Sequence, residues 1–226
     1  MTPIPLAEEL LLLAYDDETG KASGSQIGLD LGMAAAVLVE LALAGRIAMD
    51  GNMIICRDAT PVGEPIADAV LAKVAEDAPH SAASWVQRLR HRLRERVLED
   101  LCARGVMRDV DEMALEHIHI HRYPTVDSSV ERDVRTRLTA ALSGATPPDE
   151  RTAALATILA AVRMEPSLGI TGDEIRITHR KLEEIASRAG FSGDVDVNSS
   201  TVRPSVALVV AALIRAIETA LGRAPA

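Results

Sequence analysis

Residues 153–162, AALATILAAV, and residues 206–214, VALVVAALI, are the two stretches of the sequence that decide its fold. Apart from Thr157, each stretch is apolar on every side of a helix, and such a helix is stable only when other elements surround it. Both stretches are well short of the roughly 18–20 residues that cross a bilayer. The sequence therefore predicts two central helices in a helical bundle, and any contact with a membrane is expected to be peripheral.

The composition is that of one ordinary globular domain. The 226 residues are 48% hydrophobic and 25% charged, which excludes a disordered chain and predicts a single domain over residues 1–226. Aromatic residues make up only 2%, which argues against the stacking surfaces of single-strand nucleic-acid binders. The net charge of −9 argues against a protein coated in nucleic acid, although it permits one local basic patch. The two cysteines, Cys56 and Cys102, and an N-terminus without a signal-peptide pattern predict a cytoplasmic location.

Amphipathic periodicity and helix-ending residues predict further helices around the two central ones. Two capping boxes, Ser128 with Glu131 and Thr171 with Glu174, suit helix N-termini. The arginine-rich segment 84–104 is expected to be the longest charged helix. The remaining helices are predicted at residues 6–14, 29–44, 66–75, 128–142, 149–163, 180–189 and 204–221.

Two short β-hairpins complete the expected fold. The turn signal Asp50-Gly51 lies between the apolar runs 46–49 and 52–56, and a second hairpin is predicted over 106–123 with its turn at Asp111-Glu112. Each hairpin follows a helix and a glycine, so a helix–glycine–hairpin unit is predicted to occur twice, 60 residues apart. The predicted fold class is therefore all-α: a central apolar helix bundle surrounded by amphipathic helices, with two short β-hairpins.

The most distinctive motif is RLRHRLRER at residues 88–96, in which five arginines and one glutamate give a local charge of +4. On a continuous helix, the apolar side chains share one face and the arginines border it on both sides. Guanidinium groups one turn apart suit phosphate oxygens, because each makes paired charge-assisted hydrogen bonds. The alternative interpretation is a solvated helix face whose arginines pair with acidic residues elsewhere in the chain.

A run of histidines, His117, His119 and His121, lies on one face of the second predicted hairpin. We expect these side chains to bind no metal, because one strand supplies all three and no fourth ligand is apparent. The sequence contains no glycine-rich phosphate loop, nucleophile elbow or Cys-x-x-Cys pair. It therefore predicts no catalytic residues and no cofactor.

Four segments together resemble the Golgi phosphoprotein 3 family over about residues 6–142. They are LAEELLLL at 6–13, VELALAGRI at 39–47, DATPVG at 58–63, and LRER at 93–96 with the following Gly105-Val106. The resemblance implies a mostly helical single domain and a non-enzymatic peripheral membrane protein. Its implied partners are the headgroup of phosphatidylinositol 4-phosphate, held on a positively charged face, and the cytoplasmic tails of Golgi glycosyltransferases.

The resemblance also implies the headgroup-binding residues. In the family, two arginines of this basic helix bind the headgroup. Alignment through the arginine-rich motif places Arg94 at one of these positions and His91 at the second, with Arg90 adjacent. The family's tryptophan and remaining arginine fall on Ser25 and Ala34, which are departures from the pattern. The expected headgroup-binding residues are therefore Arg90, His91 and Arg94, with only a modest preference for phosphatidylinositol 4-phosphate over other anionic lipids.

Further partners follow from the same resemblance. The family's hairpin for membrane insertion and self-association corresponds to residues 106–123, so a homodimer through this hairpin is one expectation. Its acids, Asp109, Asp111, Glu112 and Glu116, would be repelled by an anionic leaflet. Two alternatives remain: a protein-interaction scaffold that has lost lipid binding, and a winged-helix-like nucleic-acid binder. Nucleic acid is not an expected partner, because the predicted recognition helix, 29–44, contains no lysine or arginine.

Overall fold

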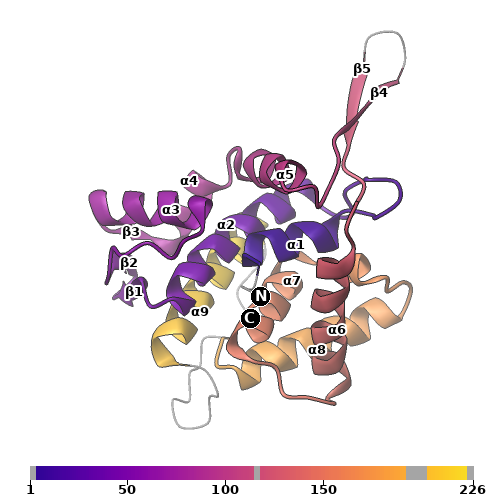
Figure 1. Ribbon diagram of the computed structural model, residues 1–226. Coiled ribbons are helices and arrows are strands. Elements are labelled where there is room, and N and C mark those ends of the chain that lie inside the picture. Colours follow the sequence, from indigo (N-terminus) through magenta and orange to yellow (C-terminus); the bar gives the residue numbers. More distant parts are fainter. Residues whose placement is uncertain (1–3, 115–117, 192–202, 223–226) are drawn as a thin grey trace.

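The computed structural model describes residues 4–114, 118–191 and 203–222. These residues form a mainly α-helical protein with two small antiparallel sheets, which confirms the predicted fold class (Figure 1). In chain order the elements are α1 Leu6–Ala14, α2 Gln26–Leu43, β1 Ile47–Asp50, β2 Met53–Cys56, α3 Pro65–Glu76, β3 His80–Ser81, α4 Ala82–Leu89, α5 Leu93–Ala103, β4 Val110–Ala114, β5 Ile118–Arg122, α6 Ser129–Ser143, α7 Glu150–Val162, the 3-10 helix η1 Glu165–Leu168, α8 Glu174–Arg188 and α9 Pro204–Ala220.

The core is built around α2, which packs against α1, α7 and α9 (Figure 1). All residues of α1 are buried, as are those of α7 from Thr152 to Val162. The prediction for residues 153–162 is therefore confirmed. The prediction for residues 206–214 holds for most of α9, but Leu208 is 50% exposed, because one side of this helix faces solvent.

Helix α2 is long and apolar enough, by length and composition alone, to cross a membrane: it has 18 residues with a mean hydropathy of 1.6. In this structure 72% of those residues are buried inside the protein, as in the core helix of a soluble bundle. Gly32 permits close packing there, since a Cβ atom at this position would lie 2.9 Å from Leu10 Cδ2 and 3.1 Å from Val162 Cγ1. The apolar character of α2 is thus satisfied by α1 and α7.

The burial of α2 also bears on the winged-helix interpretation. That interpretation requires a recognition helix with a free face to enter the groove of a duplex. Thirteen residues of α2 are buried, and neighbouring helices cover it. The interpretation is therefore wrong for this helix.

The first predicted hairpin is confirmed as β1 and β2, with Asp50 paired with Met53 across the turn. A third strand, β3, pairs with β2 and was not predicted. It consists only of His80 and Ser81, which is too short to show an alternating pattern. Its pairing depends on where the preceding helix α3 places the chain.

The second hairpin, β4 and β5, projects away from the helical body (Figure 1). The prediction that Asp111 and Glu112 form its turn is wrong, because both lie within β4 and pair with His121 and Ile120. Asp-Glu is a poor turn sequence, and the register is set by pairing along the whole strand. His117 and Glu116 lie outside the described residues.

The predicted continuous helix over residues 84–104 is wrong. The chain forms two helices, α4 and α5, separated by residues 90–92, and Arg92 has a left-handed backbone with φ of 60°. Both α4 and α5 pack against α2, but α4 also packs against α9 and α5 against α1. The break therefore lets the two helices bury their apolar residues against neighbours on different sides of α2, which local periodicity does not reveal.

Both predicted capping boxes are also wrong. The Ser128 side chain caps nothing at the start of α6, where the Asp127 carboxylate accepts the Ser129 N–H instead at 2.9 Å. Helix α8 begins at Glu174, so Thr171 lies outside it. Side-chain hydrogen bonds at helix ends depend on how the incoming chain is directed, which spacing alone does not fix.

The predicted repeat is confirmed at the helix ends. Gly45 after α2 and Gly105 after α5 both have φ of 72°. The N–H group one residue later bonds back to the equivalent carbonyl in each case, Arg46 to Leu41 at 2.8 Å and Val106 to Leu101 at 2.9 Å. The hairpins that follow differ, since β1 and β2 pack on the body and β4 and β5 project from it.

Candidate functional site

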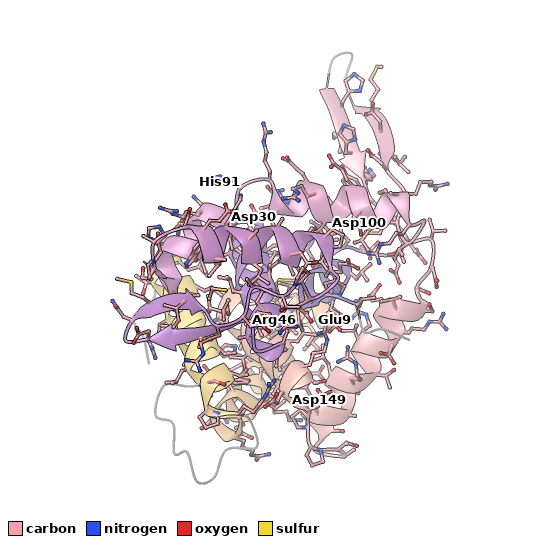
Figure 2. All side chains as sticks on the ribbon, turned by 60° about the vertical axis from the view of Figure 1, so that its left-hand side comes forward. Glu9, Asp30, Arg46, His91, Asp100 and Asp149 are labelled. Carbon is pink, nitrogen blue, oxygen red and sulfur yellow. The ribbon has the colours of Figure 1, made fainter. Side chains whose placement is uncertain are left out.

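The candidate site is the basic segment, residues 88–96, which connects α4 to α5. Arg90 and His91 lie in the turn between the two helices, and Arg94 lies in the first turn of α5. The segment is at the surface, with His91 exposed and Arg90 and Arg94 half-buried. The three predicted headgroup-binding residues thus lie at the α4–α5 turn, where Figure 2 labels His91.

The break between the helices adds positive charge to this surface. Arg92 is the N-cap of α5, and its side chain makes no capping hydrogen bond. The first amide groups of a helix carry a partial positive charge and point outward, so they favour an anion at that end. The exposed arginines Arg92 and Arg96 and the start of α5 therefore add to the same positive field.

A carboxylate that sequence reasoning missed lies within this surface. Asp30, on α2, has its Oδ1 atom 3.3 Å from Arg94 Nε, and both side chains are about one-quarter exposed. Burial raises the pKa of Asp30, and Glu95 adds to this, whereas Arg94, Arg90 and His91 oppose it. Asp30 and His91 lie on the same side of the molecule (Figure 2). A signal was available, because Asp30 is the only charged residue in the apolar run from Gln26 to Val39.

The alternative interpretation, in which carboxylates pair with the arginines, holds for two of the five. Arg94 pairs with Asp30, and Arg88 pairs with Asp77 at 3.0 Å while lying over the Trp85 ring. Within the described parts of the chain, Arg90, Arg92 and Arg96 form no ion pair, and Arg90 Nε is buried without a hydrogen-bond partner. Three arginines are therefore available to an external anion.

The two departures from the family pattern have structural roles. The Ser25 hydroxyl accepts the Gly28 N–H at 3.1 Å and caps α2, and Ala34 is completely buried. Ala34 therefore cannot contact a headgroup, and the exposed Ser25 lacks the apolar ring of the family's tryptophan. An apolar side chain is nevertheless exposed nearby, since Ile27 is 56% exposed and lies three residues before Asp30 on the same face of α2.

The histidines of the second hairpin are engaged by carboxylates. His119 Nδ1 lies 2.8 Å from an Asp111 carboxylate oxygen, and His121 Nδ1 lies 2.9 Å from one of Asp109. Hydrogen bonding to Asp109, with its charge, raises the pKa of His121. Among the residues that the structure describes, no three such side chains could hold a metal ion. The expectation that the histidines bind no metal stays a prediction.

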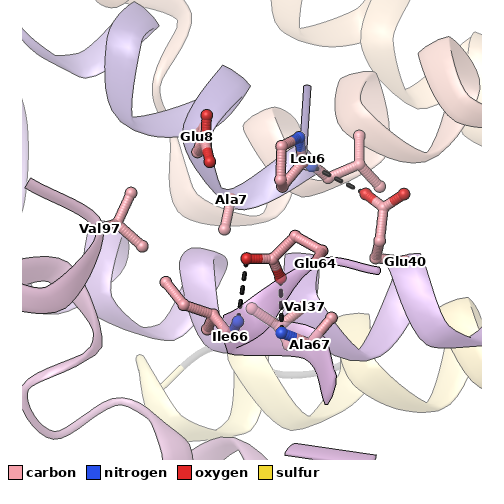
Figure 3. A pocket seen from close by; sticks show the side chains of 10 residues that line it. Leu6, Ala7, Glu8, Val37, Glu40, Glu64, Ile66, Ala67 and Val97 are labelled. Atoms are coloured by element: carbon pink, nitrogen blue, oxygen red, sulfur yellow. Dashed lines mark hydrogen bonds between the residues drawn. The ribbon is translucent and has the colours of Figure 1, made fainter. Parts of the chain in front are cut away.

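Four cavities formed by the described residues lie away from the basic segment. A cavity of about 10 Å³, enough for one water molecule, is lined by three carboxylates near the start of α1 (Figure 3). Two of them accept backbone hydrogens: Glu40 from Leu6 at 2.9 Å, and Glu64 from Ile66 and Ala67 at the start of α3. Three larger surface cavities, of about 380, 400 and 510 Å³, are also lined by residues outside the segment. None of these four cavities includes a residue of the basic segment.

The fold and the site together define a helical bundle protein with a basic surface at a helix–helix turn. The family model of Golgi phosphoprotein 3 (GPP34) matches residues 6–219, nearly the whole chain. The chain belongs to this family, whose members are non-enzymatic adaptors. The resemblance found in residues 6–142 is thereby confirmed and extended through the C-terminal helices.

Proposed function

We propose that this protein is a non-enzymatic peripheral membrane adaptor that binds anionic phospholipid headgroups through the basic segment. Arg90, His91 and Arg94 contact the phosphate groups, and Arg92 and Arg96 add to the field. The supporting observation is the α4–α5 turn, where three of the five arginines have no carboxylate partner within the described residues. The proposed location is cytoplasmic, at a membrane surface.

The overall negative charge does not oppose this function. At physiological ionic strength charges are screened over about 8 Å, so distant acids contribute little at the basic segment. Each lysine or arginine near an anionic leaflet contributes on the order of 1 kcal/mol. The local charge of +4 therefore suffices for reversible binding, although the chain carries −9 overall.

An apolar contact accompanies the charges in this proposal. Ile27 is exposed beside Asp30 and can enter the headgroup region when the basic segment rests on a membrane. Ile27 would thus supply the apolar contact that the family's tryptophan, which aligns with Ser25, supplies in other members. One isoleucine and no arginine at Ala34 give weak lipid discrimination, so we expect only a modest preference for phosphatidylinositol 4-phosphate.

Flotation with vesicles tests the proposal. The protein should float with phosphatidylcholine vesicles that contain anionic lipid and should not float with phosphatidylcholine alone. The double variant Arg90→Ala, Arg94→Ala should bind about tenfold more weakly, and added salt should weaken the wild type similarly. The matched control is Arg176→Ala, Arg180→Ala, which removes the same charge from exposed positions on α8. If the control variant bound vesicles as weakly as the Arg90, Arg94 variant, a binding site at the basic segment would be contradicted.

A second candidate function is a protein-interaction scaffold without lipid binding. The ion pair between Asp30 and Arg94 favours it, because this carboxylate already occupies part of the basic surface. Folded wild-type protein that ignores every anionic vesicle at low salt would support the scaffold over the membrane adaptor.

A further inference from the structure

We propose that Asp30 is an internal competitor for the phosphate site and determines which headgroups the site accepts. Phosphomonoester groups, which carry up to two negative charges, displace it from Arg94, whereas phosphodiester monoanions do so poorly. This inference rests on the proposed function, and it assigns to that surface a specificity-determining residue that lies on a different element.

The position of Asp30 supports direct competition. Its carboxylate lies 3.3 Å from Arg94 Nε and feels the charges of Arg90 and His91. These are the three side chains proposed to contact phosphate. An external anion at Arg94 must therefore replace the carboxylate or share the guanidinium with it.

The carboxylate cannot withdraw far from the site. Asp30 stands between Leu29 and Leu31 on α2, and both leucines are 1% exposed in the core. The backbone that carries it is fixed by packing against α1, α7 and α9. Only rotation of a short side chain is available, so Asp30 competes at a high effective concentration.

Charge and geometry then separate the two classes of headgroup. A phosphodiester monoanion that replaces Asp30 exchanges one negative charge for another and gains little. A phosphomonoester brings about 1.5 to 2 negative charges at neutral pH and three acceptor oxygens. It can accept from Arg94 and also from the guanidinium of Arg90, which is half-buried and forms no ion pair within the described residues. The bonds that a phosphomonoester makes therefore exceed those lost from the ion pair between Asp30 and Arg94, whereas a monoanion only replaces them.

The test compares two vesicle types of equal total charge, phosphatidylcholine with phosphatidylserine and phosphatidylcholine with phosphatidic acid. Wild-type protein should prefer phosphatidic acid. Asp30→Asn should strengthen binding to phosphatidylserine roughly tenfold and to phosphatidic acid less, so the preference shrinks. The control Asp50→Asn removes the same charge at the β1–β2 turn, where Asn-Gly suits the hairpin as well as Asp-Gly. It should leave the preference unchanged.

A double-variant comparison shows whether the effect passes through Arg94. In an Arg94→Ala background, Asp30→Asn should no longer alter the preference between the two lipids. If Asp30→Asn behaves like Asp50→Asn while the wild type binds, the inference is wrong and the proposed function stands. If only the Asp30→Asn variant binds vesicles, Asp30 prevents phosphate from binding to Arg94 in the native protein. If all folded variants fail to bind, the proposed function and the inference both fall.

Discussion

The arginines of this protein occupy two contrasting regions. In the basic segment, residues 88–96, arginine stands at every second position, and three of the five arginines are exposed. In a second region, named here the α1 network, three arginines distant in sequence converge on carboxylates at the start of the bundle. The members of the α1 network are Glu8, Glu9, Glu40, Arg104, Arg137 and Arg151.

The α1 network is closely paired. Arg151 Nη1 lies 2.7 Å from Glu40 and its Nε lies 3.1 Å from Glu9, which also accepts from Arg137 at 2.9 Å. Glu9 is 1% exposed, and burial raises the pKa of neighbouring Glu8 while Arg104 opposes the shift. A buried charge without a partner is very costly, so each carboxylate here has an arginine.

The basic segment and the α1 network differ in how many of their arginines are paired with carboxylates, and the spacing of the arginines along the chain explains this difference. Arginines that are close in sequence repel each other and compete for the few nearby acids, so several remain available to a ligand. Arginines scattered along the chain meet separate carboxylates when the helices pack. The dense region therefore suits binding, and the scattered region stabilises the fold.

The largest effect is expected from breaking the α1 network. Arg151→Ala leaves the half-buried Glu40 carboxylate without its ion-pair partner and the buried Glu9 with Arg137 alone, and it should lower the free energy of unfolding by about 3 kcal/mol. Urea unfolding followed by circular dichroism measures this change. Arg96→Ala is the matched control, since it removes the same charge from an exposed position. If both variants lost the same free energy of unfolding, the arginines of the α1 network would stabilise the fold no more than those of the basic segment.

An intermediate pair, Glu131 with Arg135 on α6, gives a smaller effect that depends on pH. Burial, with a contribution from Asp17, raises the pKa of Glu131 to about 7, although Arg135 opposes the shift. Because the folded protein holds this proton more tightly than the unfolded chain, the contribution of Glu131 to stability is highest below about pH 4.5 and falls as the pH rises to about 7. The fall should be about 2 kcal/mol, less than the full shift implies, because Arg135 is partly solvated. Unfolding of Glu131→Gln across this range should show a shallower slope, and an unchanged slope would contradict this assignment.

A third prediction separates stability from binding within the basic segment. Arg92→Gly relieves a left-handed backbone and should raise the free energy of unfolding by about 0.5–1 kcal/mol. It also removes one charge, so vesicle binding should weaken about fivefold. Arg92→Ala should lose the same binding without the gain in stability. A glycine variant that is less stable than the alanine variant would exclude backbone strain at this position.

The smallest effects compare two arginines of the same segment. Arg96→Ala should weaken vesicle binding a few-fold, whereas Arg88→Ala should weaken it less, because Asp77 already neutralises Arg88. The free energy of unfolding of Arg96→Ala should change by less than about 0.5 kcal/mol. Flotation at several salt concentrations measures the binding. A larger loss for Arg88→Ala would mean that pairing does not decide which arginines bind.

Much of the fold could be predicted from local patterns. The apolar runs predicted α1 with its observed bounds, Leu6–Ala14, and the Asp50-Gly51 signal predicted the first hairpin. The start of α8 was missed by six residues, because Ile175 and Ile177 alternate with polar residues as they would in a strand. Packing of Leu182 and Ile185 in the core makes this segment helical despite the alternation.

The candidate site was predictable only in part. The run of arginines located the basic segment, and the family resemblance implied Arg90, His91 and Arg94, which lie at the α4–α5 turn. It did not reveal Asp30, which is 64 residues before Arg94 in the chain. A lone charge in an apolar helix requires a partner, but the sequence does not say which of many arginines will supply it.

The sequence by itself determined which segments are helical and buried, where the positive charge is concentrated, and the family of the protein. These properties depend on residues near each other in the chain, through periodicity and local composition. Only the tertiary structure decided that residues 84–104 form two helices, that Asp30 faces the basic segment, and which arginines are already paired. The physical reason is that a bend or an ion pair depends on free energy gained against a neighbour that lies far away in sequence.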